Sequence, residues 1–191
     1  MKKAVSIVLR IFLWTALAAL MSAALLFAYF NLPGPEPRED VRFGVTFSSR
    51  FARDMGLDAS ETLRAIFADL GVRKVRIPVY WDTVERERGK FDFSDVDWQL
   101  DMARQYGAEV ILAVGQKAPR WPECFVPSWA DTEAMKNEAA KRFIQAVIDR
   151  YKHRSEITLW QIENEPFLAF GTCPSISSDV LDREIAVARR E

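Results

Sequence analysis

Histidine is almost absent from this chain of 191 residues, and neither sign of charge is in excess. The only histidine, His153, lies in a polar stretch without neighbouring ligands, so the sequence predicts no metal site. Lysine and arginine number 26 against 27 aspartates and glutamates, and this balance argues against a nucleic-acid partner. A glycine-rich turn is also missing after the first predicted strand, where Phe47 is followed by Ser48. Its absence argues against a nucleotide cofactor.

One uncharged, mostly apolar run stands near the amino terminus, at residues 11–30. Lys2, Lys3 and Arg10 precede it. Its twenty residues match the length that a helix needs to cross the hydrocarbon layer. They exceed the roughly 7 to 15 residues of a secretory signal core. We therefore predict an uncleaved signal-anchor transmembrane helix at residues 1–32, with its positive flank inside.

This anchor sets the expected location of the rest of the chain. Residues 33–40, which are polar and contain proline, are predicted to form a stiff linker. Residues 41–191 are then exported, periplasmic or extracellular, and attached to the membrane through the helix. A cleaved signal peptide and a secreted protein are the alternative.

Short β-rich runs and helical patterns alternate along the exported part. The strand-like runs fall at 41–47, 72–79, 109–114 and 157–162. The helical patterns fall at about 58–70, at about 94–107, from 131 onward, and at 177–191. This alternation with short connections predicts right-handed βαβ units and a parallel sheet, so the fold class is α/β.

A doubly wound sheet and a closed barrel both satisfy this pattern. The missing glycine-rich turn favours the (β/α)8 TIM barrel. Such a barrel takes about 250 residues, whereas residues 41–191 hold only four βα units. We therefore predict the amino-terminal half of a TIM barrel, in a truncated chain.

In a TIM barrel the active site is built at the carboxyl ends of the strands. Here these positions are polar and rich in tryptophan. They comprise Ser48, Ser49, Arg50, Tyr80, Trp81, Asp82, Gln116, Lys117, Arg120, Trp121, Glu123, Asn164 and Glu165. Indole faces stack on sugar rings, while amides, acids and guanidinium groups satisfy sugar hydroxyls. The rim therefore predicts a carbohydrate ligand, and Glu165 is a candidate for one of the two carboxylates that cleave a glycosidic bond.

Three stretches carry a family resemblance. WQIENEP at 160–166 resembles the fourth-strand signature of the clan A glycoside hydrolases. VRIPVYW at 75–81 resembles the second-strand pattern of family 5, the cellulase-like members. GKFDFSDVDWQLDMARQYGAEVILAV at 89–114 is similar to the corresponding stretch of families 5, 39 and 42. The resemblance covers about residues 41–191.

This resemblance implies a retaining glycoside hydrolase that cleaves O-glycosidic bonds in an oligo- or polysaccharide, without metal or organic cofactor. Glu165 would be the general acid and base, and Asn164 would donate to the sugar 2-hydroxyl. Arg76 would lie beneath the nucleophile and keep it ionised. The nucleophile follows strand 7 in clan A, outside the 191 residues, so the chain alone is expected to be inert or nearly so.

Glu163, Trp81 and Trp121 can each have a structural role or contact the substrate. Glu163 is expected to be a buried structural acid paired with Arg76 or another cation, and direct substrate contact is the alternative. Asn164 and Glu165 can both reach the substrate only if the end of the strand bends. Trp81 and Trp121 are candidates for sugar platforms, or else they pack beneath the loops.

Cys124 and Cys173 are the only cysteines in the sequence. They follow the third and fourth strands, which are neighbours at one face of a barrel. We therefore predict a disulfide between two rim loops rather than two free thiols.

A non-catalytic carbohydrate-binding or cell-envelope protein is the second function that the same residues allow. In that case Glu165 would be a solvated loop acid beside a turn proline. The geometry of the site, rather than the fold, separates the two functions.

Overall fold

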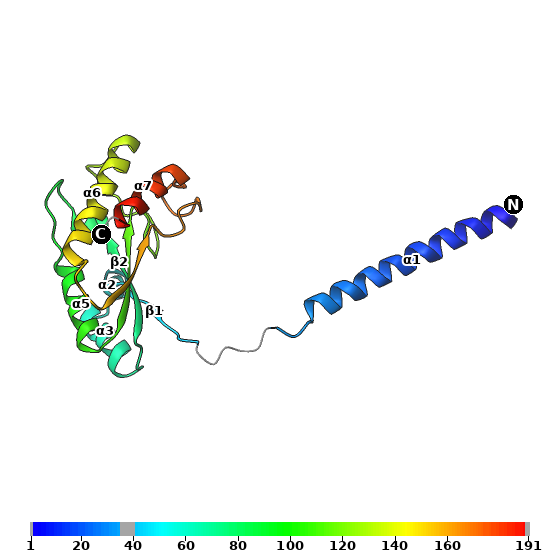
Figure 1. The fold of residues 1–191 in the computed structure, drawn as a ribbon, viewed down its shortest axis with the longest axis horizontal. Helices are drawn as coiled ribbons and strands as arrows, with labels where there is room; N and C mark the ends of the chain where they lie inside the picture. Colours follow the sequence, from blue (N-terminus) through cyan, green and yellow to red (C-terminus); the bar gives the residue numbers. More distant parts are fainter. Residues whose placement is uncertain (1, 35–40, 190–191) are drawn as a thin grey trace. The chain divides into compact units, whose positions relative to one another are not determined.

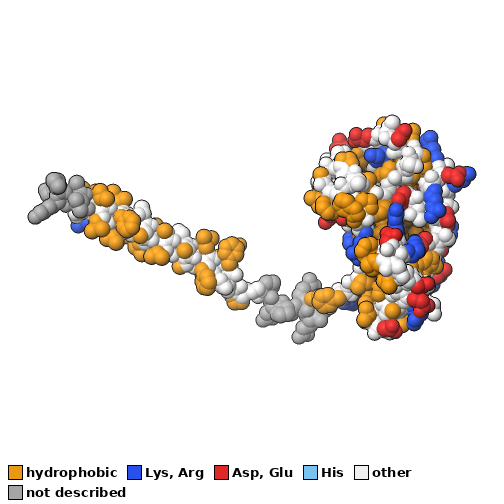
Figure 2. Space-filling view, turned by 180° about the vertical axis from the view of Figure 1, so that it is seen from behind, with side chains coloured by type: hydrophobic (Ala, Val, Ile, Leu, Met, Phe, Trp, Pro, Cys, Tyr) orange, Lys and Arg blue, Asp and Glu red, His pale blue; other side chains and the backbone are white. Residues whose placement is uncertain are grey.

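The computed structural model describes residues 2–34 and 41–189, and the chain divides into two compact units, Met1–Val41 and Arg42–Glu191. The first unit consists mainly of helix α1, Lys2–Phe30. Within α1, Ser6–Phe30 is a 25-residue stretch with a mean hydropathy of 2.2 and no buried residue in its most apolar window. Figure 2 shows the apolar side chains along this helix.

Length and composition allow α1 to cross a membrane, and a signal sequence near the amino terminus meets the same criteria. The helix ends at Phe30, and the backbone N–H and side-chain amide of Asn31 both donate to the carbonyl oxygen of Phe27, at 3.0 and 2.8 Å. Pro33 follows and cannot extend the helix. Most of the predicted linker at 33–40 lies outside the described residues.

The second unit is built on a parallel sheet of four strands in the order β1-β2-β3-β4. The strands are β1 Val45–Thr46, β2 Lys74–Tyr80, β3 Glu109–Gly115 and β4 Ile157–Ile162. The predicted parallel α/β arrangement is confirmed. Strand β1 is shorter than the predicted run at 41–47, because only Val45 and Thr46 pair with β2.

Helices α3, α5 and α6 line one face of the sheet (Figure 1), and α7 packs beside α6 and β4. Their bounds are α3 Ala59–Ala68, α5 Ser94–Gln105, α6 Glu133–Tyr151 and α7 Ser178–Ala188. Asp58, Thr132 and Ser177 cap the starts of α3, α6 and α7, each by accepting a hydrogen bond from the backbone N–H three residues on. Two short helices, α2 Ser49–Asp54 and α4 Trp81–Val84, were not predicted.

The hydrophobic core lies between this helix layer and the sheet. Its fully buried members include Leu63, Phe67, Leu100, Phe143 and Val147 from the helices and Val75, Ile77, Val110 and Leu112 from the strands. Each such side chain contributes roughly 2 kcal/mol when it leaves water. Because each helix has only one apolar stripe, the opposite stripe stays in solvent.

Trp81 belongs to this core, which corrects its prediction as a substrate-binding residue. Its side chain is 0% exposed. The indole stacks on Phe143 of α6, with ring centroids 5.5 Å apart, and meets Trp129 edge to face at 5.8 Å. The indole N–H donates to a carboxylate oxygen of Glu85 at 2.7 Å. Trp81 starts α4, and its ring packs in the helix layer.

On the other face of the sheet, the side chains at the start of β2 and β3 are only half-buried. Lys74 and Arg76 of β2 lie beside Glu109 and Ile111 of β3 there. The Lys74 Nζ and a Glu109 carboxylate oxygen are 2.6 Å apart. Four parallel strands with helices on one face form the arrangement expected of half a TIM barrel, and the full eight-stranded barrel stays a prediction.

Candidate active site

A cavity of about 780 Å3 opens at the carboxyl ends of the strands. Its lining from β1, β2, β4 and the turn after β4 consists of Thr46, Arg76, Gln161, Asn164 and Glu165. Its lining from α2 and the loop between β3 and α6 consists of Phe51, Pro119, Arg120, Trp121 and Glu123. The structure therefore brings together Arg76, Trp121, Asn164 and Glu165, all of which were predicted for the site.

Arg76 is held in the cavity by neutral partners. Its guanidinium donates to the Thr46 hydroxyl at 3.0 Å, to the Gln161 side-chain oxygen at 3.1 Å and to the Asn164 side-chain oxygen at 3.4 Å. No ion pair of Arg76 occurs among the described residues. Its positive charge therefore remains available to an anionic group in the cavity.

The end of β4 bends sharply, as the two active-site side chains require. Strand alternation stops at Ile162, and both Glu163 and Glu165 adopt left-handed backbone angles, with φ of 63° and 48°. Asn164 and Glu165 consequently line the same cavity, although they are consecutive. Asn164 is buried, whereas Glu165 is exposed.

Glu163 forms no ion pair with Arg76 or another cation among the described residues, which corrects its predicted pairing. Its two carboxylate oxygens instead accept the backbone N–H groups of Gln116 and Lys117, both at 2.7 Å. Gly115 makes room for this contact, because a Cβ at that position would lie 2.3 Å from a Glu163 carboxylate oxygen. The prediction that Glu163 is a buried acid is confirmed.

Lys117 completes the connection between the end of β3 and the turn after β4. The side chain is 1% exposed, and its ammonium donates to the carbonyl oxygens of Glu165, at 3.1 Å, and of Leu168. The backbone N–H of Asn164 donates to the Lys117 carbonyl oxygen at 3.0 Å. Glu163 and Lys117 thus fix the strained backbone that carries Asn164 and Glu165.

Glu163 also interacts with a second buried acid, Glu184 of α7. Gln116 joins the two, since its backbone N–H binds Glu163 and its side-chain amide donates to Glu184 at 3.3 Å. Burial, together with the charge of Glu184, raises the pKa of Glu163 well above its usual value. Burial raises the pKa of Glu184 to about 7, although the hydrogen bonds with Gln116 and Glu163 and the charges of Arg183 and Lys141 oppose this. The pair therefore retains a proton that free carboxyl groups would lose.

The raised pKa of Glu184 predicts how the free energy of unfolding changes with pH. The unfolded chain loses the Glu184 proton near pH 4.5, whereas the folded chain keeps it to about pH 7. The folded state binds more protons in this window, so its free energy of unfolding should fall as the pH rises through it, by roughly 3 kcal/mol. Thermal unfolding of the Glu184→Gln variant should show a smaller slope, because only buried Glu163 still holds its proton there, while an exposed control, Glu138→Gln, should keep the full slope. An equal slope in both variants would contradict the assignment.

The loops after β3 and β4 are joined at the mouth of the cavity. Cys124 and Cys173 form the predicted disulfide. The backbone N–H of Thr172 donates to the Pro122 carbonyl oxygen at 3.2 Å. Gly171 lies directly against this carbonyl, because a Cβ there would be 1.9 Å from the oxygen.

Gly171→Ala should therefore be more damaging than the same change at an open glycine. Gly171 and Gly56 both have positive φ, of 71° and 76°, but nothing lies within 4 Å of the Cβ position at Gly56. Urea unfolding should show a loss of about 3 kcal/mol for Gly171→Ala and about 1 kcal/mol for Gly56→Ala. Equal losses would mean that the two loops do not press together.

Trp121 remains a candidate sugar platform. Its side chain is 69% exposed at the cavity, and its ring meets Phe170 of the next loop edge to face, with centroids 5.8 Å apart. Phe170 is itself half exposed. An exposed indole at a polar cavity is the arrangement that favours stacking against a sugar ring.

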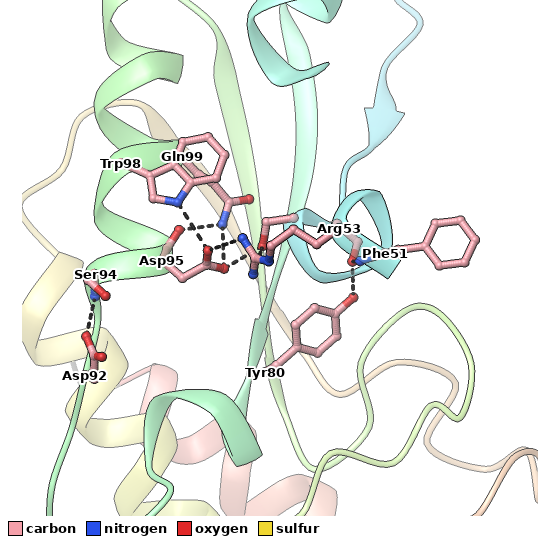
Figure 3. Close-up of polar contacts among 10 residues, drawn as sticks. Phe51, Arg53, Tyr80, Asp92, Ser94, Asp95, Trp98 and Gln99 are labelled. Atoms are coloured by element: carbon pink, nitrogen blue, oxygen red, sulfur yellow. Dashed lines mark hydrogen bonds and ion pairs between the residues drawn. The ribbon is translucent and has the colours of Figure 1, made fainter. Parts of the chain in front are cut away.

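Helix α2 places Phe51 in the cavity wall through a polar network (Figure 3). The Ser48 hydroxyl accepts the Phe51 backbone N–H at 3.0 Å and the Tyr80 hydroxyl at 2.8 Å. Ser49 and Arg53 both bind the carboxylate of Asp95 in α5, at 2.5 and 3.0 Å. Ser48 and Ser49 are buried, so these two predicted rim residues anchor the loop and do not face the cavity.

Five residues of the site were not singled out from the sequence. Thr46, Phe51, Pro119 and Gln161 line the cavity, and Glu184 interacts with buried Glu163. Gln161 stands in the quoted WQIENEP stretch and could have been found there. No sequence motif marks Glu184 as a site residue, because it occupies an ordinary position in an amphipathic helix.

The sequence is similar to those of known glycoside hydrolases. The model of the family Cellulase (glycosyl hydrolase family 5) matches residues 41–174. Endo-1,4-beta-xylanase 3 of Hypocrea jecorina is 28% identical over 145 residues, covering 73% of this chain and 40% of the xylanase. Beta-galactosidase Bga of Halorubrum lacusprofundi is 26% identical over 122 residues, covering 53% of this chain and 17% of the galactosidase.

A solved structure shares the fold. It is GH5_18 from Streptomyces cattleya in complex with GlcNAc, with a TM-score of 0.61 and 19% identity, covering 78% of this chain and 41% of that one. At this identity the likeness concerns the fold alone. The chain spans two-fifths or less of the length of the two curated relatives.

Proposed function

The chain belongs to glycosyl hydrolase family 5, and on this basis we propose that its cavity binds a glycan whose O-glycosidic bond is cleaved with Glu165 as general acid and base. The observation that carries the proposal is the shared cavity of Glu165, Asn164 and Arg76 at the carboxyl ends of parallel strands. This is the edge at which (β/α)8 enzymes place their reacting groups.

The proposed reaction has two steps and retains the configuration at the anomeric carbon. In the first, the Glu165 carboxyl donates its proton to the glycosidic oxygen as the bond to the anomeric carbon breaks, and a second carboxylate forms a bond to that carbon. In the second, the Glu165 carboxylate takes a proton from water, whose oxygen displaces the second carboxylate. Asn164 would hold the 2-hydroxyl of the sugar, and Arg76 would keep the second carboxylate ionised.

Two features of Glu165 and Arg76 support these roles. No side chain among the described residues donates a hydrogen bond to the Glu165 carboxylate, which leaves it free to meet a glycosidic oxygen. Arg76 is fixed by three neutral acceptors, so its charge can act on an incoming carboxylate. The second carboxylate is proposed to belong to a further part of the barrel, about 5 to 5.5 Å from Glu165.

The proposed substrate is an oligo- or polysaccharide outside the cytoplasm. The named relatives are a xylanase and a galactosidase, and the solved neighbour holds GlcNAc. Helix α1 would anchor the domain to the membrane with the cavity on the exported side, and cleavage of α1 would instead release a secreted protein. No metal or organic cofactor enters the proposed reaction.

A non-catalytic carbohydrate-binding protein is the second candidate, favoured by the exposed Trp121 beside the cavity. The two functions are separated by incubating the protein encoded by the complete reading frame with β-linked xylan, mannan and galactoside substrates. We expect hydrolysis, and the first product formed should keep the anomeric configuration of the substrate. Proton NMR measures this configuration. Binding without hydrolysis would favour the second candidate, and an inverted product would contradict the two-step reaction.

A further inference from the structure

Helix α7 is fastened at two points to the turn that carries Glu165. Just before the helix begins, the backbone N–H of Ile176 donates to the Pro166 carbonyl oxygen at 2.6 Å. Farther along, the carboxyl groups of Glu184 and Glu163 are in hydrogen-bond contact. Both are buried, with exposed fractions of 0% and 2%. An acid of α7 therefore contacts the end of β4 two residues before Glu165.

The contact between these two acids requires a proton. Both Glu163 oxygens accept backbone N–H groups, from Gln116 and Lys117, at 2.7 Å. One Glu184 oxygen accepts the Gln116 side-chain amide at 3.3 Å. The other, Oε2, is buried and receives no hydrogen bond from an amide, hydroxyl or ammonium group among the described residues. An ionised carboxylate only accepts hydrogen bonds, so two carboxyl groups bond to each other only through a proton.

No cation takes the place of this proton. The charged groups around the pair come from three elements: Lys117 after β3, Glu133, Lys136, Glu138 and Lys141 of α6, and Arg183 of α7. None of them forms an ion pair with Glu163 or Glu184 among the described residues. Burial raises the pKa of Glu184 to about 7 against the charges of Arg183 and Lys141. The Lys117 ammonium binds backbone carbonyl oxygens instead.

We propose that Glu184 is a positioning residue: the proton that it shares with Glu163 holds α7 against the turn that carries the proposed general acid, and loss of that proton releases the turn. This inference rests on the proposed function, because it says how that site is held and over which pH range it works. Once both acids are ionised, two buried negative charges lie in contact and repel. Glu163 keeps its two backbone donors, so the contact with α7 is the one that weakens. Asn164 and Glu165, which line the cavity, then lose part of their support and glycan affinity falls.

The test uses the protein encoded by the complete reading frame in a Glu165→Gln background, where the proposed general acid adds no pH dependence of its own. Calorimetry measures the affinity for xylotetraose, cellotetraose and mannotetraose from about pH 5.5 to about pH 8.5. Affinity for the tightest probe should be constant at low pH and fall above about pH 7, by up to about tenfold per pH unit, because one proton is released. The exposed control Glu138→Gln should show the same fall.

Two substitutions of Glu184 separate positioning from packing. The Glu184→Gln amide can donate to Glu163 and accept from Gln116 at every pH, and a single ionised Glu163 meets no second charge. Its affinity should therefore show no fall above about pH 7. Glu184→Ala makes neither bond and should bind about 3- to 10-fold more weakly even at low pH, the factor of one hydrogen bond. A fall with pH that Glu184→Gln keeps would overturn the inference, as would undiminished binding by Glu184→Ala.

Amide hydrogen exchange decides the inference separately from the proposed function. The Asn164 backbone N–H donates to the Lys117 carbonyl oxygen at 3.0 Å. Its protection relative to a free peptide should fall above about pH 7 in the unchanged protein and persist in Glu184→Gln. Equal protection at low and high pH in the unchanged protein would overturn the inference, while binding of a probe would keep the proposed function. Loss of protection without binding of any probe would overturn the proposed function alone.

Discussion

Replacing Glu165 with glutamine is expected to lower kcat/KM for glycan hydrolysis by about 100- to 10,000-fold, measured in the protein encoded by the complete reading frame. Glutamine fills the same space but carries no transferable proton. A sugar leaving group is a strong base and needs that proton as the glycosidic bond breaks. The loss should therefore appear in hydrolysis while glycan binding remains.

Substrates with different leaving groups provide the internal control for Glu165→Gln. An aryl glycoside with an acidic phenol needs little help from a proton donor, so its first step should slow far less than that of a glycan. Glu138→Gln, an exposed change on α6, should leave both rates unchanged. Equal losses for the two kinds of substrate would mean that residue 165 does not protonate the leaving group.

The two tryptophans predicted as sugar platforms should give opposite results. Trp81→Ala removes a fully buried ring that packs on Phe143 and Trp129, and it should lower the free energy of unfolding by about 4 kcal/mol. Trp121→Ala removes an exposed ring and should change stability by about 0.5 kcal/mol or less. Chemical unfolding followed by circular dichroism measures both.

The two tryptophan variants should also differ in their affinity for a glycan. Trp121→Ala should lose affinity for a tetrasaccharide while it stays folded, because only the stacking face is gone. Any loss in Trp81→Ala should follow the fraction of unfolded protein and disappear at lower temperature. A stable Trp81→Ala chain with lost binding would restore Trp81 to the site.

The helices followed from apolar periodicity and the strands from short β-rich runs between them, because both patterns reflect which side chains are buried. The positions of β2, β3 and β4 were predicted closely for this reason. Helix α4 was missed because its four residues are too few to show a period. That omission placed Trp81 on the rim, when the turn of α4 directs it into the core.

The sequence identified Glu165 and Asn164 but not the contacts that position them. The sequence required a bend for Asn164 and Glu165 both to reach the substrate, and the left-handed angles at Glu163 and Glu165 supply it. Such angles arise from tertiary contacts, here the bonds of Glu163 and Lys117 between β3 and the turn after β4. Those bonds join residues that lie nearly fifty positions apart in the chain, where no local pattern reports them.

The central claim is that Glu165 meets the glycosidic oxygen of a glycan in this cavity. A crystal structure of the Glu165→Gln protein with a bound tetrasaccharide tests it most directly. The account predicts that the residue 165 side chain lies about 2.6 to 3.2 Å from a glycosidic oxygen, with Asn164 at the neighbouring 2-hydroxyl. A tetrasaccharide bound away from Arg76, Asn164 and residue 165 would contradict it.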